Sequence, residues 1–228
     1  MRKFPALVAV IALSLAAPAY PKPPETWDGL ILVKSKKLEN VYLLPDADFR
    51  VYTKVMLDTP EVAFRKNWRR DTNSNSRGMG NISEEEARNI LDEAEKRFER
   101  IFSEAFSKGG YEIVTAPGPD VLRVQTALIN LDIAAPDMMT ASHTRTYTRE
   151  AGQATAVVRA KDSVSGQTLG QAIDAQWTGD NGPYFRNRTT NIADFEDLFD
   201  SWARDTVAGI AKLKASSPVD ADGTLRRK

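Results

Sequence analysis

The chain has no cysteine and only one histidine, His143, among its 228 residues. Without cysteine the protein can form no disulfide, thiol nucleophile, zinc knuckle or iron–sulfur cluster. A lone imidazole excludes a site built from several histidines and leaves only His143 as the base of a Ser-His-Asp triad. Because His143 lies in a polar stretch between predicted strands, we interpret it as a surface residue. We therefore predict no catalytic residues, no metal ligands and no cofactor.

An excess of charge of one sign is also missing. The sequence holds 31 basic and 31 acidic side chains, and its mean hydropathy is −0.40. Such values are typical of a soluble globular protein. A general nucleic-acid or polybasic membrane binder needs a clustered positive excess, which the whole-chain balance does not provide. We predict no nucleic-acid partner.

The sequence has one long hydrophobic run, at residues 4–17. Arg2 and Lys3 precede it, and Ala17-Pro18-Ala19 follows as a small-x-small cleavage site. These three parts predict a secretory signal peptide over residues 1–19, and its apolar core is too short for a transmembrane helix. Removing Arg2 and Lys3 leaves 29 basic against 31 acidic residues, a net charge near −2. We expect an exported protein without a transmembrane span.

No linker rich in proline, glycine or serine divides the remaining chain into halves. We therefore predict an extended lead-in over residues 20–26, one globular domain over 27–217 and a flexible tail over 218–228.

The clearest predicted element is a helix over residues 83–108. Ser83 and Glu86 form a capping-box pattern at its start, and Gly109-Gly110 ends it. Its apolar residues recur every three or four positions, which places them on one face. They are Ala87, Ile90, Leu91, Ala94, Phe98, Ile101, Phe102 and Ala105.

A second amphipathic helix is predicted over residues 192–214, with Asn191 and Asp194 as a weaker capping pair. Its apolar face consists of Phe195, Leu198, Phe199, Trp202, Val207, Ile210 and Leu213. Two helices with one apolar face each, separated by strands, predict a layer of helices on a sheet.

Alternating residues predict a long strand over 121–133. One face holds Leu122, Val124 and Leu128. The other holds Val121, Ala127, Ile129, Leu131 and Ile133, and Arg123 and Gln125 interrupt its beginning.

A hairpin follows, with strands at 154–161 and 168–178 around a turn at 162–166, and Gly170 marks a bulge. Shorter strands are predicted at 30–34, 51–57 and 111–115. The expected fold is a two-layer α/β (α+β) domain. It has a mixed or mostly antiparallel sheet of five or six strands and two long helices on one face.

Residues 59–82 have no predicted element, and loops of this length are often functional. The loop contains a basic and aromatic group, Arg65, Lys66, Trp68, Arg69 and Arg70. Arginine and tryptophan are frequent at binding hot spots, and guanidinium groups bind phosphate or carboxylate groups bidentately. An arginine-rich surface around one anchoring tryptophan is the alternative. These five residues are the predicted interaction site.

Other patterns are weaker. Asp194, Glu196, Asp197 and Asp200 are four acids of the second helix, and they motivate an alternative function as a carboxylate-based hydrolase or sugar-binding protein. A solvated helix face is the preferred explanation of these acids. Gly78-Met79-Gly80 lacks the rest of a dinucleotide fingerprint, and Asp180-Asn181 lacks the ligand spacing of a calcium loop.

Several segments together resemble the bacterial family catalogued as domain of unknown function 3313, over roughly residues 27–218. They are Tyr52–Asp58, Val62–Phe64, Lys108–Tyr111, Pro117–Arg123, Asp162–Gly166, Asp194–Phe199 and Trp202-Ala203. The resemblance implies an envelope lipoprotein, but it supplies no activity or catalytic set. Family members carry a lipid-modified cysteine at the cleavage site, which this chain lacks. With this departure, the resemblance implies a freely soluble protein of the bacterial periplasm, with outer-membrane association as an alternative.

We expect a non-enzymatic envelope protein that binds an envelope protein or an anionic envelope component. Besides the hydrolase, the second alternative is a small-ligand carrier with an apolar pocket between sheet and helices. Neither the partner nor the oligomeric state follows from the sequence.

Overall fold

The structure is a computed structural model that describes residues 22–75, 81–134, 146–148, 151–179, 184–186 and 188–220. Several predictions lie outside the described residues. They are the signal peptide over 1–19, the polar residue His143, and the motifs Gly78–Gly80 and Asp180-Asn181.

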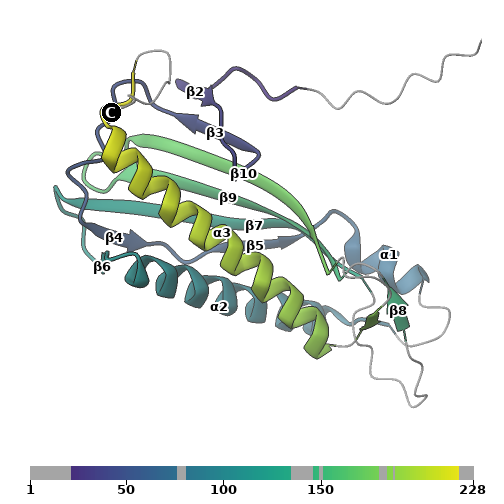
Figure 1. The fold of residues 1–228 in the computed structure, drawn as a ribbon. Coiled ribbons are helices and arrows are strands. Elements are labelled where there is room, and N and C mark those ends of the chain that lie inside the picture. Colours follow the sequence, from purple (N-terminus) through teal and green to yellow (C-terminus); the bar gives the residue numbers. More distant parts are fainter. Residues whose placement is uncertain are drawn as a thin grey trace, which may run out of the picture.

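One mixed sheet of nine strands forms the body of the molecule (Figure 1). Its order is β1-β2-β3-β10-β9-β7-β4-β6. β5 also pairs with β7, next to a later part of that strand than β4 does. The bounds are β1 Thr26–Trp27, β2 Leu30–Val33, β3 Asn40–Leu43, β4 Lys54–Leu57, β5 Glu61–Phe64, β6 Glu112–Ile113, β7 Val121–Ile133, β9 Gly152–Asp162 and β10 Thr168–Thr178. β4 and β5 run parallel to β7, β6 runs parallel to β4, and the other pairs are antiparallel. The predicted five or six strands were too few, because β1, β3 and β5 have only two to four residues each.

Two further strands, β8 (Thr146–Thr148) and β11 (Tyr184–Arg186), pair separately from this sheet. The described helices are α1 (Trp68–Asn75), α2 (Glu84–Lys108) and α3 (Arg188–Ser216). The two long helices lie side by side on one face of the sheet (Figure 1), as the sequence predicted, so the fold class is α+β.

The region between 59 and 82 is not a long loop, since it contains β5 and α1. The second long helix also differs from its prediction, because α3 begins at Arg188. Asn191 and Asp194 therefore lie within the helix and are not its N-terminal cap.

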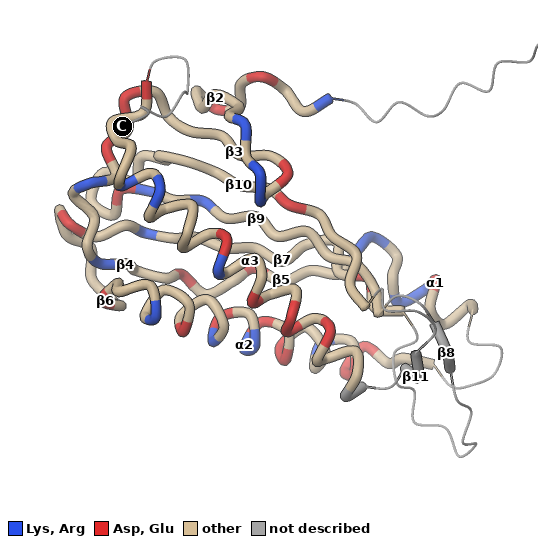
Figure 2. The backbone as a smooth tube through the Cα atoms, in the orientation of Figure 1, with Lys and Arg blue, Asp and Glu red and all other residues tan. Residues whose placement is uncertain are grey.

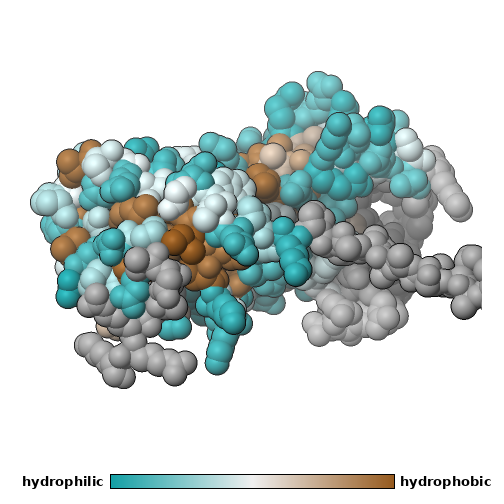
Figure 3. All heavy atoms as spheres, turned by 90° about the horizontal axis from the view of Figure 1, so that it is seen from above, coloured by the Kyte–Doolittle hydropathy of each residue, from teal (hydrophilic) through white to brown (hydrophobic). Residues whose placement is uncertain are grey.

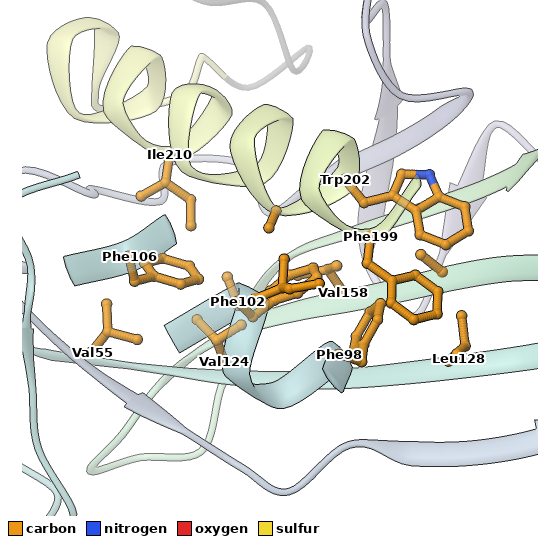
Figure 4. Close-up of a cluster of buried hydrophobic side chains, with 14 of the residues drawn as sticks. Val55, Phe98, Phe102, Phe106, Val124, Leu128, Val158, Phe199, Trp202 and Ile210 are labelled. Carbon is orange, nitrogen blue, oxygen red and sulfur yellow. The ribbon is translucent and has the colours of Figure 1, made fainter. Parts of the chain in front are cut away.

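Aromatic side chains from both long helices fill the space above the sheet (Figure 4). Phe98 contacts Phe199 across the helix pair, with ring centroids 5.1 Å apart in an edge-to-face arrangement. The sheet side of this core is made by Leu122, Val124, Leu128 and the small residues of β9.

β7 changes its facing at Asn130, which adopts a positive φ of 53°. On either side of it, Ile129 pairs with Thr155 and Asp132 pairs with Gln153, so the β7 segment has one residue more than the facing β9 segment. This bulge turns Leu131, which is 1% exposed, to the side of Leu128 and the helices. The predicted second face was thus wrong for Leu131, because strict alternation ends at the bulge.

The folded part extends past residue 217, where the predicted domain ends. Val219 is fully buried in the core. Its N–H donates to the Ala47 carbonyl, and its carbonyl accepts from the Asp46 N–H, both at 3.0 Å. The beginning of the predicted tail is therefore attached to the segment after β3.

Both predicted termini of α2 are present. The Ser83 hydroxyl accepts from the Glu86 N–H at 3.1 Å, and the Glu86 carboxylate accepts from the Ser83 N–H at 2.7 Å. At the other end, Gly110 has a φ of 85°, a conformation that favours glycine.

Removing the Ser83 cap should lower stability. We expect Ser83→Ala to reduce the free energy of unfolding in urea by about 1 kcal/mol, because the Glu86 N–H loses its acceptor. Ser107→Ala is the matched control, since Ser107 is exposed at the other end of the same helix. Equal stability of the two variants would contradict the role of the cap.

Candidate functional site

The sheet has a second face, turned away from α2 and α3, which we call the outer face. Its residues follow from the strand register. Arg123 of β7 lies opposite Lys161 of β9, and two positions further Gln125 lies opposite Arg159, which in turn lies opposite Gln171 of β10. Because side chains alternate along a strand, these residues point away from the core residues Leu122 and Val124. Arg123, Arg159 and Lys161 thus form a cluster, which we call the basic patch.

One carboxylate, Asp58, lies beside the basic patch. Arg123 Nε donates to its two oxygens at 2.9 and 3.0 Å, and Gln125 Nε2 donates at 2.7 Å. Burial raises the pKa of Asp58, but the hydrogen bonds from Arg123 and Gln125 and the nearby charge of Lys161 outweigh burial and leave the pKa below its usual value. Asp58 is therefore ionised at neutral pH and neutralises one of the three cations.

The other two cations are less compensated. Arg159 is exposed and donates through Nε to Gln171 Oε1 at 2.6 Å. Among the described residues, no carboxylate lies within ion-pair distance of Arg159 or Lys161. Gln171 is only 6% exposed, and its Nε2 has no hydrogen-bond partner in the described part of the chain. Because that nitrogen is buried, the patch offers an anion two cations, Arg159 and Lys161.

Apolar side chains continue the outer face beyond the basic patch. The next row across the strands is Ala127, Val157 and Ile173, and the row after it is Ile129, Thr155 and Ala175. Trp177 then lies opposite Gln153 and is 60% exposed. We call Ala127, Ile129, Val157, Ile173, Ala175 and Trp177 the apolar strip.

A second tryptophan lies near the basic patch. Trp27 of β1 is 38% exposed and packs edge-to-face on Tyr42, with centroids 5.9 Å apart. Tyr42 pairs with Gln171, so this contact is on the outer face. Figure 3 views the molecule from the β2 and β3 side and shows hydrophobic side chains between hydrophilic ones there.

The predicted interaction residues at 65–70 lie at the end of the sheet, around the start of α1. Trp68 is 1% exposed and stacks on Phe64 with ring centroids 3.9 Å apart. Arg65 bridges two carboxylates, Asp132 at 2.6 Å and Asp71 at 2.7 Å. Trp68 is thus an anchor in the fold, and Arg65 stabilises the connection between α1 and β7.

The remaining cations of this segment lie at the surface. Arg69 pairs with Glu84 at 3.0 Å and Arg70 with Asp71 at 3.3 Å, while Lys66 is exposed. The segment is therefore mostly neutralised by its own neighbours. Its role in binding stays a prediction.

The acids of α3 do not form a buried group. Asp197 is exposed, and Glu196 pairs with Arg97 at 2.8 Å and Arg100 at 2.9 Å across the two long helices. In the described ranges, the one acidic residue that is buried is Asp174, at 4% exposure. Its oxygens accept from the Glu39 N–H at 2.7 Å, Trp202 Nε1 at 2.6 Å and Gln176 Nε2 at 2.5 Å. No group of three or more metal-ligating side chains occurs among the residues described.

The sequence predicted only part of the outer face. It identified Arg123 and Gln125 as polar interruptions of an apolar strand face, but it did not predict that they lie beside Arg159 and Lys161. The alternation of Arg159 and Lys161 with buried alanines in β9 was the further signal.

Fold and site together define an α+β protein with one sheet face covered by helices and one that carries a basic patch and an apolar strip. The chain belongs to the family described as "Protein of unknown function (DUF3313)", which matches residues 27–206. No curated protein matches it. In the described part of the chain, no helix has the length and apolar character needed to cross a membrane.

Among solved structures, the chain is similar to the PelC dodecamer from Paraburkholderia phytofirmans, with 9% identity, a TM-score of 0.41, and coverage of 75% of this chain and 95% of that chain. It is also similar to protein XCC0632 from Xanthomonas campestris, with 11% identity, a TM-score of 0.39 and coverage of 76% and 91%. A third similar structure is a minor lipoprotein from Acinetobacter baumannii, with 10% identity, a TM-score of 0.29, and coverage of 71% of this chain and 94% of that chain. Likenesses this weak identify no ligand or partner.

Proposed function

We propose that this protein is a non-catalytic binding protein of the bacterial envelope that holds an anionic component on its outer sheet face. The observation that supports the proposal is the basic patch. Arg159 and Lys161 have no carboxylate within ion-pair distance in the described part of the chain. A guanidinium and an ammonium group on one face of β9 attract the oxygens of a phosphate or carboxylate group.

The distribution of charge favours the same face. The sequence of α2 contains eight acidic and five basic residues, and that of α3 contains five and four, so the helix layer has a net charge of 9 − 13 = −4. Figure 2 shows these acidic positions along both helices. An anionic partner is therefore repelled by the helix layer and attracted to the outer face.

Photo-crosslinking in intact bacterial cells tests this function. A photoreactive residue in place of Ala175 on the outer face should form adducts with an envelope component. The triple variant Arg123→Gln, Arg159→Gln and Lys161→Gln should lose most of these adducts, because it removes the charges that attract the anion. A photoreactive residue in place of Asp197 on α3 should form few.

The chain offers a charge-matched control. Lys66→Gln, Arg69→Gln and Arg70→Gln remove the same number of positive charges from the 65–70 segment and leave Arg65 in place. We expect this control to keep the adducts. If it loses them while the outer-face variant keeps them, the interaction belongs to the 65–70 segment and our assignment is wrong.

A further inference from the structure

We propose that the anionic component is the phosphate headgroup of membrane lipids, and that the outer face lies against an anionic bilayer with Trp177 at the interface. This inference rests on the proposed function and specifies its ligand. The inference explains why the basic patch and the apolar strip occur on one surface. A small anion would need only the basic patch, whereas a lipid bilayer contacts both.

The spacing of the two features suits an interface. Arg159 and Gln153 are six residues apart on β9, which corresponds to about 20 Å along a strand. Trp177 lies opposite Gln153, and Val157 and Thr155 lie between. The cations and the exposed indole are therefore separated along the face by short, mostly apolar side chains. A surface of this kind contacts headgroups at one end and the upper acyl region at the other.

Tryptophan is a favourable residue at such a position. The indole has a large apolar surface and one N–H donor, a combination that is enriched at membrane interfaces. Trp177 is 60% exposed and Trp27 is 38% exposed, and both belong to the outer face. The other two tryptophans, Trp68 and Trp202, are each 1% exposed in the fold.

The charge of the outer face determines its orientation. Asp58 is paired with Arg123, which leaves the positive charges of Arg159 and Lys161 on the patch. Asp132 is paired with Arg65, and Glu61 is exposed at the β5 edge of the apolar strip. Each basic residue near an anionic surface contributes about fivefold to binding. Since the helix layer is acidic, it should point away from the membrane. Local clustering thus supplies the positive surface that the whole-chain balance did not predict.

Vesicle binding tests the inference, with the full chain lacking its signal segment and carrying Trp27→Phe. In this background Trp177 is the strongly exposed tryptophan of the described part of the chain. Vesicles of phosphatidylcholine with added phosphatidylglycerol should sediment the protein and shift its fluorescence to shorter wavelength. Pure phosphatidylcholine vesicles should do neither. Trp177→Phe should remove the shift.

Two charge variants have opposite expected effects. Arg159→Gln should weaken vesicle binding about fivefold, and Asp58→Asn should strengthen it by about the same factor, because it releases the charge of Arg123. Added salt should weaken vesicle binding by the starting protein and by both charge variants. An effect of the same sign in both variants would overturn the role of the basic patch.

The remaining outcomes separate this inference from the proposed function. Equal binding to phosphatidylcholine vesicles would show a purely apolar contact and overturn the lipid-phosphate assignment. Soluble glycerol 1-phosphate should not displace the protein from vesicles. If it does so at a concentration equal to that of the lipid phosphate, the ligand is a small soluble phosphate, which also overturns the assignment. No vesicle binding, with crosslinking from position 175 still dependent on the basic patch, would reject the lipid and leave the proposed function standing.

Discussion

Replacing Phe102 with aspartate should destabilise the protein by about 4 kcal/mol or more. Phe102 is 2% exposed on α2, and its ring centroid lies 4.5 Å from that of Phe98 (Figure 4). A carboxylate at this position would be buried among aromatic rings and would also leave a cavity. For a domain of this size, the loss corresponds to a decrease of about 10 °C in the thermal midpoint, measured by circular dichroism.

Lys96→Asp is the matched control, because it introduces the same side chain at an exposed position of the same helix. Surface substitutions of this kind usually change stability by about 0.5 kcal/mol or less. A Phe102→Asp variant with the midpoint of the Lys96→Asp variant would contradict the packing of α2 on the sheet.

The second large effect concerns Asp174 of β10. We expect Asp174→Ala to lower the free energy of unfolding by about 3 kcal/mol, since it removes the acceptor of both Trp202 Nε1 and the Glu39 N–H. Asp197→Ala, the same substitution at an exposed position of α3, should change stability little. Urea denaturation of both variants measures the difference.

A double-mutant cycle identifies the cause. Trp202→Phe removes the indole donor and keeps an aromatic ring in the core. If the Asp174–Trp202 bond carries much of the effect, the double variant should be more stable than the sum of the two single changes predicts. Strict additivity would show that Asp174 acts without this bond.

The sequence was most informative where structure is local. The helix at 83–108 was predicted with its capping box, because Ser83 and Glu86 are three residues apart and need no distant partner. The hairpin of β9 and β10 was also predicted, because its strands are joined by a short turn, and the bulge expected at Gly170 lies between Thr168 and Gly170. The short strands β3 and β5 were missed because four residues carry little periodic signal and depend on pairing with distant strands.

The candidate site was harder to predict for a related reason. Arg65, Lys66, Arg69 and Arg70 are close in sequence and so were noticed, but a partner of Arg65, Asp132, is 67 residues away. The basic patch is the opposite case, since Arg123 is 38 residues from Lys161 and only strand pairing brings them together. A high density of charge in the sequence therefore pointed to the 65–70 segment, which is neutralised by its neighbours. It did not point to the basic patch, whose residues are distant in sequence.

The backbone bonds between Val219 and the segment after β3 have a consequence for how the domain is made. Asp46 N–H and the Ala47 carbonyl obtain these partners from Val219, which lies far from them in the sequence. A growing chain therefore cannot complete this part of its core until Val219 has been added. In a shorter, incomplete chain the backbone groups of Asp46 and Ala47 remain open to solvent.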